Sequence, residues 1–270
     1  MKKSWIDHVI EWGTTRRVPW WALVADARGL VETTVSQTFR DSSHHRIDLE
    51  ESVTLGTIHW VFFDLGCTLI DESVAMQDAH GQLVRALAQS GVETSEADIE
   101  DALAPAWEAF EPSPIVHVLT QLTGSRDGAR GALKQISYDK SLDIPYGETE
   151  ALLAALSGSF NLGVIANQSM GTETRLRSYG LFDYFQVCLA SAEEGVAKPD
   201  PALFHRALER TGCAAENALM VGDRIDNDIR PAKLLGWRTI RILQGHGKKV
   251  GVIRHPMPYG NLEKQRVQRF

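Results

Sequence analysis

An aspartate and a glycine that directly follow an apolar run are the strongest chemical signal in this chain. The run occupies residues 58–63, and Asp64 and Gly66 come after it. A carboxylate at the carboxyl end of a parallel strand lies at the edge where open α/β sheets bind ligands. There it can act as a nucleophile, a metal ligand or both. Gly66 permits a close approach or a positive φ, and its carbonyl oxygen is free to face a cation.

A second acidic segment follows another apolar run. Asp223 comes after Met220–Gly222, and Asp228 lies five residues further along. Mg²⁺ prefers oxygen ligands and is often held by one or two carboxylates together with phosphate. Asp64 and Asp223 are the candidate pair, with Asp228 in a supporting position. Capping of the helix that follows is the alternative explanation for these acids.

Two further segments supply candidate phosphate contacts. Lys198 precedes Pro199, which favours an extended turn at the lysine. Neighbouring carboxylates would hold that lysine as a cation, and it can then balance a phosphate. Asn167 and Gln168 follow an apolar segment and precede a helical one. Their amides, with the N–H groups of a helix start, can form an anion site, although an ordinary capping turn looks the same.

The elements that must position these residues alternate between strand and helix. Short segments rich in Val, Ile and Phe predict five strands: Ile58–Leu65, Asn161–Ala166, Phe185–Ala190, Ala218–Val221 and Arg238–Leu243. Helical patterns lie between the later strands: Glu148–Leu156, Thr172–Tyr179, Pro201–Thr211 and Asp226–Leu235. This alternation predicts an α/β fold with a doubly wound parallel sheet, which brings the four polar segments to one edge.

Residues 70–160, between the first two strands, are too many for a crossover, and most of them show helical spacing. We expect residues 72–144 to form an all-α cap. Its expected features are the helices 74–89, 115–122 and 129–137, a capping box at Ser95, and breaks at Pro105 and residues 111–114. The core then comprises residues 58–71 and 145–245. Residues 1–57, with four of the seven tryptophans, are expected to form a helical extension, and residues 246–270 a tail.

Composition excludes several classes of function. The net charge of −7 argues against a nucleic-acid partner, because proteins that track phosphates carry basic faces. The sequence contains no run of the ~20 apolar residues that span a bilayer. Three widely spaced cysteines fit a reduced compartment better than a disulfide framework. We therefore expect a cytoplasmic protein with neither a nucleic-acid nor a membrane partner.

The polar segments, in this order and spacing, resemble those of the haloacid dehalogenase-like hydrolase superfamily over roughly residues 58–245. The position of the insert resembles that of members with a helical cap. The resemblance implies that Asp64 is a nucleophile that forms an aspartyl-phosphate, and that Lys198 is the lysine of the third motif. It also implies a metal site made of Asp64, the Gly66 carbonyl and Asp223, supported by Asp228.

Two positions depart from the pattern of the family's phosphatases. Those enzymes usually have a second aspartate two residues after the nucleophile, acting as general acid and base, where this chain has Gly66. They usually have Ser or Thr at the end of the second strand, where this chain has Ala166 followed by Asn167. General acid–base catalysis typically contributes about 10²–10⁴-fold. Slow turnover, a good leaving group or a substitute donor from the cap would each accommodate the first departure.

The resemblance implies a Mg²⁺-dependent hydrolase, namely a phosphatase of a small phosphorylated metabolite. The phosphate would contact Asn167, Gln168 and Lys198. A haloacid dehalogenase is one alternative, although its metal-free reaction gains nothing from extra acids near the nucleophile. Phosphonate cleavage is another and would need a cap lysine, for which the cap offers Lys134 and Lys140. A catalytically weak phosphate-binding or scaffold protein is the third.

Overall fold

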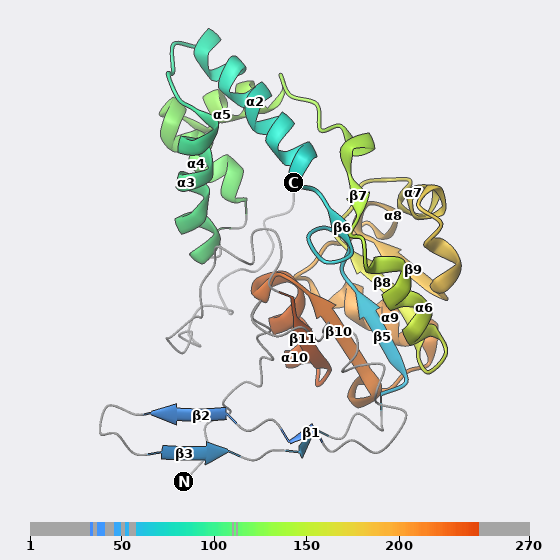
Figure 1. Cartoon of the computed structure of the whole chain (residues 1–270). Coiled ribbons are helices and arrows are strands. Elements are labelled where there is room, and N and C mark those ends of the chain that lie inside the picture. Colours follow the sequence, from blue (N-terminus) through green and yellow to red (C-terminus); the bar gives the residue numbers. More distant parts are fainter. Residues whose placement is uncertain are drawn as a thin grey trace.

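The computed structural model describes residues 58–242, except residues 110 and 112, and the strand backbones of four short segments nearer the N-terminus. Its main feature is a sheet of parallel strands in the order β11-β10-β5-β8-β9 (Figure 1). The strands are β5 (Trp60–Phe63), β8 (Asn161–Ala166), β9 (Val187–Ala190), β10 (Ala218–Gly222) and β11 (Arg238–Arg241). The expected α/β architecture is confirmed, and the strands end within a few residues of their predicted bounds.

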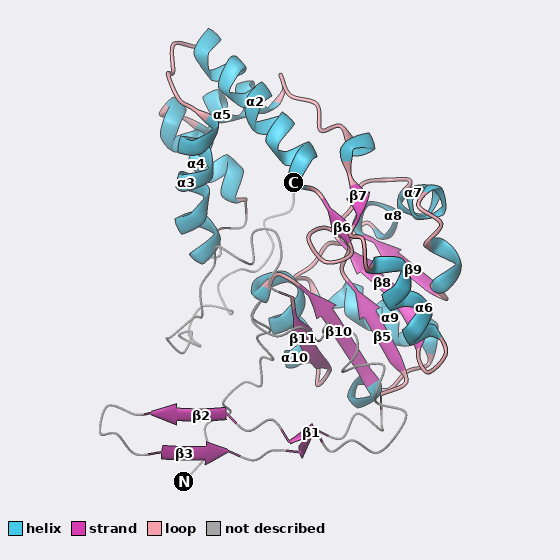
Figure 2. Ribbon diagram, viewed as in Figure 1, coloured by secondary structure: helices cyan, strands magenta, loops and turns pink. Residues whose placement is uncertain are grey.

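Helices cover both faces of the sheet, as Figure 2 shows. On one face, α6 (Thr149–Ser157) and α7 (Thr172–Ser178) contribute leucines to a cluster that also contains Phe63 and Val164. On the other, α9 (Pro201–Thr211) and α10 (Arg230–Leu234) pack against Phe62 and Met220. Both faces of the central strands are therefore buried, which explains why these strands read as continuous apolar runs rather than alternating ones.

The order of the strands places a switch point beside β5. The chain proceeds from β5 to β8 and β9 in one direction, then returns to β10 on the other side of β5. In open α/β sheets the crevice at such a point, at the carboxyl ends of the strands, binds ligands. Phe63 is paired with Val221, and the Asp64 N–H donates to the Val221 carbonyl at 2.9 Å. Asp64 and Asp223 therefore leave adjacent strands side by side.

A helical segment lies between the first two strands of the sheet in sequence. It starts and ends at a two-stranded antiparallel pair, β6 (Ile70–Asp71) with β7 (Ile144–Pro145). In Figure 1, the helices of this segment lie beyond the carboxyl ends of β5 and β10. They are α2 (Ser73–Gln89), α3 (Glu96–Glu108), α4 (Pro114–Thr123) and α5 (Arg126–Leu133). We call residues 72–144 the cap.

The cap helices pack around an apolar cluster of their own, which includes Leu83, Ile99 and Leu119. The capping box expected at Ser95 is present, since its hydroxyl accepts from the Asp98 N–H and the Asp98 carboxylate accepts from the Ser95 N–H. The expected break at Pro105 is wrong, because α3 continues to Glu108. Burial of Leu103 and Ala106 in the cap cluster offsets the loss of the backbone hydrogen bond that the proline cannot make.

The described parts of residues 1–57 are four short strands. They form two antiparallel pairs, β1 (Thr33–Thr34) with β4 (Ser52–Val53) and β2 (Gln37–Arg40) with β3 (Arg46–Leu49). Over these segments the backbone is extended, which differs from the expected helical extension. The rest of residues 1–57, including its four tryptophans, and the expected tail at 246–270 lie outside the described residues. In the part of the chain that the structure describes, no helix combines the length and apolar character needed to cross a membrane.

Candidate active site

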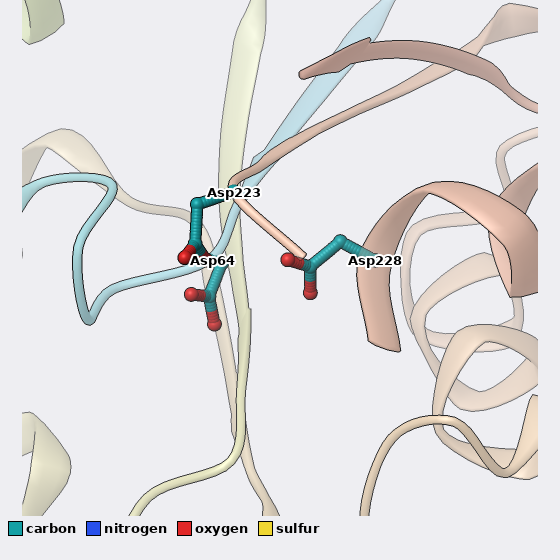
Figure 3. Close-up of side chains that lie close together, drawn as sticks. All are labelled: Asp64, Asp223 and Asp228. Atoms are coloured by element: carbon teal, nitrogen blue, oxygen red, sulfur yellow. The ribbon is translucent and has the colours of Figure 1, made fainter. Parts of the chain in front are cut away.

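Three carboxyl groups from distant parts of the sequence meet at the switch point (Figure 3). Asp64 follows β5, Asp223 follows β10, and Asp228 comes from the turn that precedes α10. One oxygen from each of the three lies within 4.8 Å of the others, a spacing that suits a shared metal ion. The structure therefore brings together the three acids that the sequence singled out.

Asp228 reaches this cluster because the chain forms a π-helical turn, Ile225–Ile229, where the sequence predicted the start of an α-helix. Wider turns of this kind occur frequently at functional sites. The Asp228 carboxylate accepts a hydrogen bond from the Arg224 N–H at 3.0 Å. It also occupies the space beside Gly222, where a Cβ atom would lie 2.5 Å from its Cγ atom. A side chain at position 222 would therefore displace Asp228.

Lys198 joins the acids from a separate loop. Its side chain is 1% exposed, and its Nζ atom donates to Asp64 Oδ1 at 2.6 Å, to Asp228 Oδ1 at 2.6 Å and to the Ile165 carbonyl at 2.8 Å. An ammonium group has three N–H donors, so these acceptors use all of them. Lys198 thus fixes the orientation of the Asp64 and Asp228 carboxylates.

Asn167 holds the backbone of this lysine in place. Its Nδ2 group donates to the Lys198 carbonyl at 2.8 Å, and its Oδ1 atom accepts from the Lys198 N–H at 2.8 Å. The sequence suggested a phosphate contact for Asn167. The structure gives its side chain a second task, which is to position Lys198.

The charges of this cluster fit a cation. Burial raises the pKa of Asp223 well above its usual range, and repulsion from Asp228 and Asp64 raises it further. Burial also raises the pKa of Asp228, although Lys198 opposes the change. Burial would lower the pKa of Lys198, but attraction to these carboxylates outweighs it and the pKa is raised. Three carboxyl groups around one ammonium leave an excess of negative charge, and their oxygens are the ligands that a hard divalent cation prefers.

Gln168 lies at the junction of core and cap. Its Oε1 atom accepts hydrogen bonds from Arg175 Nη2 at 2.6 Å and from Lys140 Nζ, on the cap, at 3.0 Å. Its Nε2 group donates to Glu72 Oε1 at 3.4 Å. The side chain is therefore oriented with its amide N–H₂ toward the first residue of the cap.

Glu72 is the site residue that sequence reasoning missed. It is the N-cap residue of α2, and its carboxylate lies against Gly66, where a Cβ atom would be 2.5 Å from Oε2. Burial, followed by repulsion from Asp143 and Asp64, raises the pKa of Glu72 to about 7. An acid at the start of a helix is common, so residue type alone did not distinguish Glu72 from an ordinary first-turn acid.

The sequence suggested a close approach or a positive φ at Gly66, and the structure shows the first of these. The close approach is present, because Glu72 occupies the space of its missing side chain. A positive φ is not used there and occurs at Cys67 instead, with φ of 55°. This turn is closed by hydrogen bonds from the Ile70 N–H to the Leu65 carbonyl and from the Cys67 N–H to the Ile70 carbonyl, both at 2.9 Å.

The cap also contacts the core through a cation–π pair. The guanidinium of Arg224 lies 4.5 Å from the ring centroid of Trp107 in α3. The same guanidinium donates from Nε to Asp226 Oδ1 at 3.0 Å. Arg224 follows Asp223 directly, so the loop that carries Asp223 also carries this contact with the cap.

Comparison with known proteins agrees with this geometry. A family model described as haloacid dehalogenase-like hydrolase matches residues 58–236. The chain is 29% identical over 195 residues to a glyceraldehyde 3-phosphate phosphatase of Methanopyrus kandleri, covering 68% of this chain and 84% of that protein. It is 31% identical over 183 residues to the pyrimidine 5'-nucleotidase YjjG of Escherichia coli, covering 63% and 79%.

A solved structure supports the fold independently. A haloacid dehalogenase-like hydrolase from Streptococcus pneumoniae aligns with a TM-score of 0.56 and 22% identity, covering 72% of this chain and 90% of that one. The family model spans the strands β5, β8, β9 and β10, the cap and the loops that carry Asp64, Lys198 and Asp223. The chain therefore belongs to the haloacid dehalogenase-like hydrolase family.

Proposed function

We propose that this protein is a Mg²⁺-dependent phosphatase of a small phosphorylated metabolite that acts through an aspartyl-phosphate. The observation that carries the proposal is the buried cluster of Asp64, Asp223 and Asp228 held by Lys198. Phosphoryl transfer needs positioned charge more than covalent help from the protein, and this cluster provides it. Relatives named as a phosphatase and a nucleotidase support the same class of substrate.

Asp64 is the proposed nucleophile. Lys198 bonds to its Oδ1 atom, so Oδ2 is the oxygen positioned to attack phosphorus. Lys198, with its charge retained by two carboxylates, also helps to balance the charge of the phosphoryl oxygens. Asn167 holds the backbone of Lys198 in position. Gln168 lies at the junction with the cap, where the phosphate would enter.

The proposed ligands of the cation are Asp64, Asp223 and the Gly66 carbonyl, with Asp228 in support. Bound Mg²⁺ would neutralise negative charge on the phosphate and so favour attack by a carboxylate. Asp228 is bonded to Lys198 and to the Arg224 N–H, which suits a residue that orients the others.

The acidic cluster favours a phosphatase over a haloacid dehalogenase. A dehalogenase carboxylate attacks carbon and needs no cation, so two additional buried acids beside the nucleophile would only oppose its reaction. A metal-dependent phosphatase requires such acids as ligands. A phosphate-binding scaffold would retain the fold, yet it has no need of a lysine that orients a nucleophile.

The test is phosphate release from a panel of phosphorylated sugars, nucleotides and hydroxy acids, with Mg²⁺ and with a chelator. We expect release from at least one class with Mg²⁺, loss of release with the chelator, and loss in Asp64→Asn. Glu150→Gln, which alters an exposed acid at the start of α6, is the matched control. Phosphate release that survives in a folded Asp64→Asn variant would refute the mechanism.

A further inference from the structure

The reaction proposed above needs a proton at two moments. The oxygen that leaves phosphorus must be protonated unless it is a stable anion, and the water that later cleaves the aspartyl-phosphate must lose a proton. Lys198 has all three N–H groups bonded to Asp64, Asp228 and Ile165. Position 66, two residues after the nucleophile, is a glycine and has no side chain to supply the proton.

A carboxyl group from the cap fills the vacant space at position 66. A Cβ atom on Gly66 would lie 2.5 Å from Oε2, 2.7 Å from Oε1 and 2.7 Å from Cδ of Glu72. All three atoms belong to the carboxyl group, so it is the reactive end of Glu72, and not its stem, that occupies the position. A side chain at position 66 and the side chain of Glu72 would therefore occupy the same place.

Other groups hold this carboxyl in position. Gln168 Nε2 donates to its Oε1 atom at 3.4 Å, and the Gln168 Oε1 atom is itself fixed by Arg175 at 2.6 Å and Lys140 at 3.0 Å. Gln168 bonds to Oε1 and not to Oε2, and Oε2 is the atom that lies closest to the position of the missing side chain. Glu72 also begins α2, so its position depends on how the cap sits on the core.

We propose that Glu72 is the general acid and base of this enzyme and replaces, from the cap, the side chain that Gly66 lacks. The inference rests on the proposed phosphatase function. In the first step an Asp64 oxygen bonds to phosphorus, the bond from phosphorus to the leaving oxygen breaks, and the Glu72 carboxyl group gives its proton to that oxygen. In the second step Glu72 takes a proton from water, the water oxygen bonds to phosphorus, and the aspartyl-phosphate bond breaks. Asp64 and protonated Glu72 are restored.

The first experiment measures turnover of Glu72→Gln on an alkyl phosphate and on p-nitrophenyl phosphate, with Mg²⁺ present. Nitrophenolate departs without a proton, whereas an alkoxide does not. We expect release of the alkyl alcohol to fall by about 10²–10⁴-fold, and release of the first equivalent of nitrophenolate to change by less than about threefold. Glu150→Gln should match the wild type on both substrates.

The second step gives an independent measurement. Without a base, hydrolysis of the aspartyl-phosphate should slow, so rapid mixing of Glu72→Gln with p-nitrophenyl phosphate should show a burst approaching one nitrophenolate per enzyme. The aspartyl-phosphate should then accumulate and be detected by mass spectrometry after an acid quench. These readouts separate a proton-transfer role from a loss of structure, which would diminish the burst as well.

A rescue experiment tests whether a carboxylate at position 66 can take the place of the Glu72 carboxyl group. Gly66→Asp should restore alkyl phosphate turnover in a Glu72→Ala background, because the alanine leaves room for the new carboxylate. Gly66→Asp alone should gain far less, since its side chain would meet the Glu72 carboxylate.

Failure of the proposed function and failure of the proposed role of Glu72 would give different results. No phosphate release from any substrate by the wild type would overturn the proposed function. An active wild type, an inactive Asp64→Asn variant and a Glu72→Gln variant with wild-type rates on both substrates would overturn the role of Glu72 alone.

Discussion

The buried site of the core contains charged side chains, whereas the buried cluster of the cap is apolar. In the core, Lys198, Asp223 and Asp228 are buried at the strand ends beside Asp64. In the cap, the buried cluster consists of leucine, isoleucine, valine and alanine side chains, and the acid of the Ser95 capping box, Asp98, lies at the surface. Buried charges are stable only when they are paired, and pairing requires exact positions that parallel strands provide. The cap cluster needs only apolar burial. Charged side chains at the two ends of the cap, Glu72, Lys140 and the buried Asp143, contact the core instead.

The difference separates stability from function. The cap cluster stabilises the structure and contributes no charge to the site, whereas the core cluster carries the proposed chemistry and stores repulsion among its acids. Mutations in the two regions should therefore differ in how their effect on stability depends on pH, and removal of a core acid should stabilise the protein.

Removal of the lysine should have the largest effect. Lys198→Met leaves the carboxylates of Asp64, Asp223 and Asp228 without their cation, and removing one partner of a buried ion pair typically costs about 3–5 kcal/mol. Urea denaturation at pH 8 should show that loss, and it should shrink at pH 5 because protonation removes the repulsion. A loss below about 1 kcal/mol at pH 8 would show that the lysine does not hold the cluster.

Truncation inside the cap should have a comparable but pH-independent effect. Leu119 is 0% exposed, and Leu119→Ala should destabilise the protein by about 2–5 kcal/mol, equally at pH 5 and pH 8. Val74→Ala, at a half-exposed position on α2, is the control and should change stability by less than about 0.5 kcal/mol. We expect Mg²⁺ binding to survive in Leu119→Ala, as measured by calorimetry. Loss of that binding would show that the core site depends on the cap cluster.

Removal of a buried acid should stabilise the metal-free protein, in contrast to the two substitutions above. Burial and repulsion raise the pKa of Asp223, so the ionised group destabilises the metal-free protein at neutral pH. In buffer with a chelator, Asp223→Asn should raise the midpoint of urea denaturation at neutral pH. The same variant should lose the rise in melting temperature that Mg²⁺ gives to the wild type. A variant that retains the full Mg²⁺ shift would remove Asp223 from the set of metal ligands.

Loss of a helix cap should have the smallest effect. Ser95→Ala removes the acceptor of the Asp98 N–H and should cost about 1 kcal/mol, with no change in phosphate release. Denaturation and steady-state kinetics on the same preparation would test both parts. A clear fall in turnover would show that the start of α3 communicates with the site.

Residue order was enough to predict the sheet, the cap and the main site. The strand before Asp64 and the helix Pro201–Thr211 appear where the patterns placed them, because period and punctuation are local properties. The start of α10 was not predicted, since a π-helical turn depends on the contacts of Asp228 with Lys198 and Gly222. The continuation of α3 through Pro105 likewise depends on packing within the cap.

By itself, the sequence determined that Asp64, Lys198 and Asp223 would meet, because parallel strands bring their carboxyl ends to one edge whatever lies between them. It did not determine what stands beside Gly66. That space is filled by Glu72, whose carboxyl group arrives there through the turn after β5 and the start of the cap. A missing side chain is visible in a sequence. The group that takes its place is decided by distances across the folded chain, which no spacing of residues encodes.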